Sequence, residues 1–134
     1  MHEGWSAEDY LILFSEVEGA VAADRYGIST ALPGYRLHGL VGWDDFIVCN
    51  ATGGTYRVPT VPLDRQFMRP FALPSDLTGL KADARLAGRI KWYVQPVVFG
   101  GDPNVGDNLT WVTHDQHAQL VVWWNRQYQA LKRS

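Results

Sequence analysis

Two histidines are the first residues whose types and spacing could do chemistry. His114 and His117 lie three positions apart, and Asp107 and Asp115 are close to them in sequence. Imidazole and carboxylate groups bind zinc, but a metal site needs three or four such ligands converging on one point. At the start of a predicted helix these two histidines need not converge, because His117 is expected to face the core. We therefore expect no metal and no cofactor, and the alternative is a small metal-dependent hydrolase using residues 102–117.

Other patterns typical of enzymes are incomplete. Asp44 and Asp45 are adjacent, but neighbours on an extended chain point to opposite faces and do not easily share one substrate, so we expect a solvated turn. The glycine-rich residues 100–107 lack the lysine and the serine or threonine of a phosphate-binding loop. Cys49 ends an apolar run and is expected to be buried in the core. The chain is therefore not expected to be an enzyme.

The composition predicts one domain spanning residues 1–134. Of its 134 residues 46% are hydrophobic, which is enough for a core without a cofactor. Its 12 Lys and Arg against 14 Asp and Glu give a net charge of −2, so no nucleic-acid surface is expected. No apolar stretch reaches the roughly 20 residues of a membrane span, and no signal peptide is recognisable. The lone cysteine fits a reducing compartment, so we expect a cytoplasmic protein without a membrane partner.

Two amphipathic helices are predicted near the ends of the chain. The first is expected over residues 7–26, with Ser6 as its N-terminal cap and Gly27 at its end, because apolar residues recur there every three to four positions. The last helix is expected to follow Thr113 and Gln116, which have the spacing of a capping box. Its apolar stripe would close the core.

Between the helices the sequence changes to short runs rich in β-branched and aromatic residues, which is typical of strands. The expected strands are residues 35–40, 45–50, 55–61, 89–98 and 109–112. Glycines in residues 50–54 predict a hairpin loop, and Pro74 is expected to begin one short helix. Because strands follow one another through short connections, we predict an α+β domain with a mainly antiparallel sheet of about five strands, packed against an N-terminal and a C-terminal helix.

Aromatic side chains are frequent, with six Trp and six Tyr. Both types provide large contact areas at low entropic cost and are enriched at protein interfaces. Three tryptophans are expected in the core, namely Trp92, Trp111 and Trp124. Trp43, which stands between a glycine and an aspartate, and Trp123 are expected to be partly exposed.

Several short motifs over about half of the chain are similar to those of one superfamily. They are Tyr26–Ile28, Leu32–Tyr35, Gly42–Asp45, Phe46–Val48, Thr55–Pro59 and Val61–Asp64. Together they resemble the SUKH superfamily, which includes fungal SMI/KNR-like cell-wall assembly regulators and bacterial immunity proteins that neutralise toxins. The resemblance implies a SUKH-like, non-enzymatic α+β domain that recognises a protein partner.

We therefore predict an immunity protein that neutralises a bacterial toxin by direct binding. Its acidic loops would complement a basic, nuclease-like toxin, because opposite charges speed association and enforce specificity. The expected partner contacts are Trp43, Asp44, Asp45, Asp102 and Asp107. A regulatory domain that binds a small molecule in an aromatic pocket is a further alternative.

Overall fold

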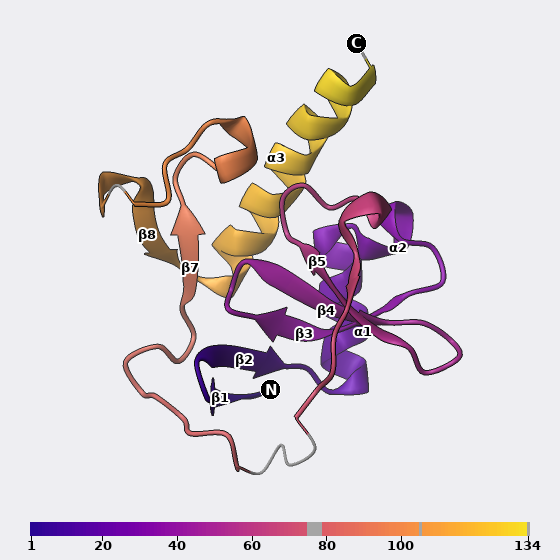
Figure 1. Ribbon diagram of the computed structural model, residues 1–134, viewed down its shortest axis with the longest axis vertical. Helices are drawn as coiled ribbons and strands as arrows, with labels where there is room; N and C mark the ends of the chain where they lie inside the picture. Colours follow the sequence, from indigo (N-terminus) through magenta and orange to yellow (C-terminus); the bar gives the residue numbers. More distant parts are fainter. Residues whose placement is uncertain (75–78, 105, 134) are drawn as a thin grey trace.

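The computed structural model of the protein describes residues 1–74, 79–104 and 106–133, which form two antiparallel sheets and two long helices (Figure 1). The predicted α+β class is confirmed. The first sheet contains, in this order, β1 (His2–Ser6), β2 (Asp9–Leu13), β3 (Arg36–Val41), β4 (Asp45–Cys49), β5 (Thr55–Pro59) and β6 (Arg69–Pro70). The second pairs β7 (Ile90–Tyr93) with β8 (Leu109–Val112), and the helices are α1 (Glu16–Tyr26), the short α2 (Ile28–Ala31) and α3 (His114–Arg133). No helix in this described part is long and apolar enough to cross a membrane.

The N-terminal residues form a β-hairpin, so the predicted first helix is wrong over its initial turns. β1 and β2 pair antiparallel, and Ala7 in the turn between them has a positive φ of 53°. Residues 10–13 are a continuous apolar run buried on both faces of the sheet, a pattern that also matches helical spacing. The helix begins later, where Ser15 and Glu18 form the capping box. Its predicted end is confirmed, because Gly27 adopts the left-handed conformation with φ 77°.

The five predicted strands are all present among the described residues, and β1, β2 and β6 were not predicted. The predicted hairpin loop is confirmed, because β4 and β5 pair antiparallel on either side of it. Within the loop, the Asn50 side-chain oxygen accepts hydrogen bonds from the backbone N–H groups of Thr52 (3.2 Å) and Gly54 (2.7 Å). This side chain therefore holds the turn in place.

Two further predictions are corrected or lie outside the described residues. β7 ends at Tyr93, short of the predicted residue 98, because the chain turns after Pro96 into a 3₁₀ helix over Val97–Phe99. The short helix predicted from Pro74 falls on residues 75–78, which are outside the described residues.

Both faces of the first sheet are covered. The larger core lies between this sheet, α1, α3 and β7, and its fully buried side chains include Tyr10, Ile12, Phe46 and Ile90. The opposite face carries Leu11, Leu13, Val41 and Ile47, which pack against Phe71, Leu73 and Leu80 from the segment after β6. Cys49, at the end of β4, is only half-buried, so the prediction that it fills the core is wrong. It lies at the rim because the strand ends there.

One buried side chain of helix α3 contacts both α1 and the second sheet. The predicted capping box of this helix is confirmed, because Thr113 and Gln116 exchange hydrogen bonds of 3.0 and 3.2 Å. One turn further on, His117 is fully buried, as predicted. A hydrogen bond of 2.6 Å joins its Nδ1 to the Tyr26 hydroxyl on α1, and its ring lies edge-on to Trp92 on β7, 5.4 Å between centroids. His117 therefore connects α1, α3 and the second sheet.

Burial makes this histidine a source of pH-dependent stability. Desolvation, assisted by nearby His114, lowers the pKa of His117 from 6.5 to about 3. The unfolded chain then binds one more proton than the folded chain between these two values, so the free energy of unfolding falls as the pH falls through that window. The imidazole stays neutral in the folded protein at neutral pH.

We predict that the wild-type protein loses up to about 1.4 kcal/mol of stability per pH unit from His117 below pH 6.5. His117→Asn keeps an acceptor near the position of Nδ1 but removes the titration, so its free energy of unfolding should depend less steeply on pH. Urea denaturation from about pH 5 to pH 7 measures the difference, in a range where most carboxylates stay ionised. Equal slopes in the two proteins would contradict the assignment.

Candidate functional site

Trp43 lies at the β3–β4 turn and is only 9% exposed, so the expectation that it is partly exposed is wrong. Its ring is stacked on Tyr10, 5.0 Å between centroids, and makes edge contacts with Trp5 and Trp111 at 5.9 and 5.2 Å. Trp43 also has a positive φ of 63°, which is costly for a residue with a bulky side chain and persists because the packing holds it. This tryptophan attaches the turn to β8.

The neighbouring carboxylates have different partners. Asp45 is buried and accepts hydrogen bonds from Arg57 Nε (2.7 Å) and Nη2 (2.6 Å), with Arg69 at 3.5 Å, so the expected solvated turn is wrong at this residue. Asp44 is exposed, and its carboxylate lies 3.5 Å from Lys91 on β7. The ammonium group of Lys91 also lies over the rings of Trp43 and Tyr93. Asp45 therefore stabilises the sheet, whereas Asp44 remains accessible at its edge.

Asp102 and Asp107 belong to a separate exposed region, the β7–β8 lobe, which we define as residues 90–112 with the exception of 105. Both side chains are exposed, and neither forms an ion pair with another described residue. The loop that carries them is ordered by Asn108, whose amide donates to the carbonyl oxygens of Gln95 (3.0 Å) and Asp102 (3.3 Å). Gln95 N–H in turn donates to Asn108 Oδ1 at 2.7 Å. The two carboxylates are therefore presented on a preorganised loop, at the opposite end of β7 from Asp44.

Large apolar side chains are exposed in the same lobe. They are Val94, Val97, Val98, Leu109 and Trp111, each between 39% and 55% exposed. The prediction that Trp111 lies in the core is therefore wrong, whereas Trp92 is buried as predicted and Trp123 on α3 is half exposed as predicted. Trp124 is partly buried and connects α3 to the lobe, because its ring lies 4.9 Å from that of Phe99.

The lobe has a single basic residue, Lys91, which is paired with Asp44. Residues 92–125 contain three aspartates and no Lys or Arg. An exposed apolar surface with a polar rim is the usual composition of a protein-binding site. The geometry therefore brings Asp102 and Asp107 into one candidate surface with apolar residues that sequence reasoning did not select.

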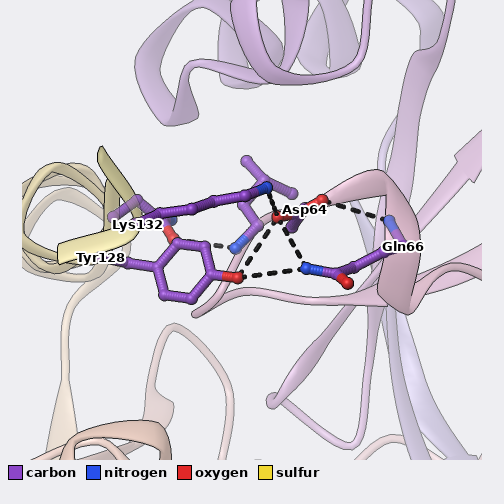
Figure 2. A network of polar contacts seen from close by, with 6 residues as sticks. Asp64, Gln66, Tyr128 and Lys132 are labelled. Carbon is purple, nitrogen blue, oxygen red and sulfur yellow. Dashed lines mark hydrogen bonds and ion pairs between the residues drawn. The ribbon is translucent and has the colours of Figure 1, made fainter. Parts of the chain in front are cut away.

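A second candidate is a groove of about 750 Å³ between the α1–α2 junction and α3. Figure 2 shows the contacts at its rim, where Asp64 accepts hydrogen bonds from Lys132 Nζ (2.6 Å), Gln66 N (3.2 Å) and the Tyr128 hydroxyl (3.3 Å). The Lys132 ammonium lowers the pKa of Asp64. Arg65 and Arg126 also line the groove, so its charged residues are mainly basic. No sequence motif predicted this groove, because its residues come from segments far apart in the chain.

The histidines do not form a metal centre with the nearby acids. His117 is enclosed by Tyr26 and Trp92, and Asp115 forms an ion pair of 2.6 Å with Arg25. Across residues 1–74, 79–104 and 106–133, no three His, Cys, Asp or Glu side chains are placed to hold a metal ion.

Comparisons of the chain with protein-family models, with curated proteins and with solved structures found no match. The resemblance to the SUKH superfamily stays a prediction from the short motifs.

The two carboxylates of the β3–β4 turn provide a matched pair of variants. We predict that Asp45→Ala lowers the free energy of unfolding by about 2 kcal/mol or more, because it leaves the half-buried Arg57 guanidinium without its carboxylate. Asp44→Ala should cost less than about 1 kcal/mol, because the Asp44 side chain is 48% exposed and its ion pair with Lys91 is long, at 3.5 Å. Urea denaturation of both variants measures this difference. Similar losses in the two would show that Asp45 is not the structural member of the pair.

Proposed function

We propose that this chain is a non-enzymatic protein-binding domain whose contact surface is the β7–β8 lobe. The observation that carries the proposal is the combination of five exposed apolar side chains with two exposed carboxylates that have no ion-pair partner among the described residues. Large apolar side chains that are exposed near one another on a surface are typical of sites that a partner covers. The backbone at Gln95 and Asp102 is already held by Asn108, so it loses little conformational entropy on binding.

The partner in this proposal is a basic protein. Apart from Lys91, which is paired with Asp44, the lobe has no Lys or Arg, so it attracts cationic surfaces and repels acidic ones. A nuclease-like toxin domain has this chemistry, and the resemblance of residues 26–64 to the SUKH superfamily supports the same role. We therefore propose a cytoplasmic immunity protein that neutralises a bacterial toxin by direct binding. Trp43 would act indirectly in this role, by supporting Trp111.

The titratable groups support a structural rather than a catalytic role. The N-terminal ammonium lowers the pKa of Glu18 to about 2, and Arg85 lowers that of Asp83 to about 2. The pKa of Asp64 is lowered in the same way by Lys132. Carboxylates perturbed by ion pairs of this kind stabilise folds, whereas a general acid or base has to face a substrate.

A regulatory domain that binds a small anionic ligand is the second candidate function. It is favoured by the groove beside α3, where Arg65 and Arg126 are available to a carboxylate or phosphate group. Because the groove and the lobe involve different residues, substitutions in each separate the two functions.

We predict that Asp102→Lys/Asp107→Lys lowers the affinity for the natural partner by about tenfold or more, because it reverses the charge that attracts a basic surface. The partner is first captured from the source organism with the intact chain, identified by mass spectrometry and purified, and its Kd is then measured by calorimetry. Glu8→Lys/Asp9→Lys is the matched control, since it makes the same change in net charge at the exposed β1–β2 turn.

Wild-type affinity should also decrease as salt increases. An unchanged Kd in the lobe variant, or an equal loss in both double variants, would contradict the proposal.

A further inference from the structure

The backbone of β8 has one free edge. The hydrogen bond from Val94 N–H to the Asn108 carbonyl, 2.8 Å, extends the β7–β8 ladder by one pair and fixes which pairs exchange hydrogen bonds. Pairs alternate along an antiparallel ladder, so Trp92 and Thr110 bond to each other. The N–H and C=O groups of Leu109 and Trp111 therefore point away from β7. No hydrogen bond to them is present among the described residues, and Figure 1 shows β8 at the outside of the molecule.

The other sheet edges are protected in ways that β8 is not. The edge of β1 is closed where Trp5 and Lys81 exchange backbone hydrogen bonds of 2.8 and 3.0 Å. β6 has only two residues, Arg69 and Pro70, and the outer edge of β7 carries Lys91. Short length, proline and lysine are the usual protection of an edge against another strand. β8, Leu-Thr-Trp-Val, is twice as long as β6 and contains neither proline nor lysine.

We propose that the partner adds an extended strand of its own to the free edge of β8. This inference rests on the proposed function and specifies how the β7–β8 lobe binds. Backbone groups of the added strand bond to Leu109 and Trp111, and its apolar side chains contact the side chains of these two residues, which share one face of the sheet.

The charge around β8 indicates which side chains the added strand carries. Asp107 lies just before β8, and the absence of Lys and Arg from residues 92–125 favours a strand with lysine or arginine beside its apolar positions. A second copy of this chain fits less well, because it would bring the same aspartates together and its Lys91 is already paired with Asp44. The occupant is therefore an extended, basic and apolar segment of another protein.

A synthetic peptide tests the edge directly. The probe is a short peptide of alternating valine and lysine with blocked ends, and amide hydrogen exchange of the full chain is followed by NMR. We expect protection of the Leu109 and Trp111 amides, and little change at Thr110 and Val112, whose amides already face β7. A peptide with glutamate in place of lysine should bind about tenfold more weakly or worse. A peptide N-methylated on the alternate residues that face β8 should lose binding to a similar extent, because it lacks those donors.

Two variants of the chain complete the test. Leu109→Lys places a charge on the edge strand and should weaken binding of the valine–lysine peptide about tenfold. Val17→Lys is the matched control, because Val17 is an exposed valine on α1, outside the β7–β8 lobe, and it should retain binding. The inference is overturned if the basic peptide does not bind, if N-methylation has no effect, or if the chain pairs β8 with a second copy instead.

Failure of this inference and failure of the proposed function are distinguishable. If the purified natural partner binds Leu109→Lys as tightly as the wild-type chain but not Asp102→Lys/Asp107→Lys, the function stands and strand addition is wrong. If the peptide protects Leu109 and Trp111 but the lobe variants leave partner binding unchanged, the edge is real and the proposed function is wrong.

Discussion

Helix α3 packs against α1 and β7, and the buried His117 is the side chain that contacts both. The His117 ring is hydrogen-bonded to the Tyr26 hydroxyl and lies edge-on to Trp92. Helices α1 and α3 and strand β7 therefore meet at one neutral imidazole. The two-stranded sheet has no backbone ladder to the six-stranded sheet among the described residues. Its position is held by side-chain contacts, among them those of Trp92 with His117, Phe99 with Trp124 and Trp111 with Trp43.

This arrangement explains why the lobe is both ordered and exposed. Trp92 turns inward to His117, so alternate residues of the two-stranded sheet face outward, including Leu109 and Trp111. In the loop between the strands Asn108 bonds to the carbonyl oxygens of Gln95 and Asp102, and the Asp102 and Asp107 carboxylates form no ion pair with another described residue. The basic groove uses other side chains of α3, near the Asp64 contacts. Helix α3 thus lies between the acidic, apolar β7–β8 lobe and the basic groove. A basic partner is attracted to the lobe.

Local signals predicted much of the fold, whereas the environment of single side chains depended on tertiary contacts. Thr113 and Gln116 identified the start of α3 because a capping box is formed by residues three apart. The β1–β2 hairpin was missed because an apolar run buried on both faces of a sheet lacks the alternation typical of a strand. Trp43 seemed exposed beside Gly42 and Asp44, yet Tyr10 and Trp111 cover it from distant segments. The groove was not predicted, because it requires Asp64 to meet Lys132 across 68 positions.

The central claim is that a protein partner covers the β7–β8 lobe. Hydrogen–deuterium exchange across the whole chain, followed by mass spectrometry with and without the purified natural partner, tests this claim most directly. The account predicts that the partner slows exchange in peptides from residues 94–111 and leaves exchange around residues 26–31 and 63–66 unchanged. Slower exchange around those two segments, with no change in residues 94–111, would contradict it and assign binding to the groove.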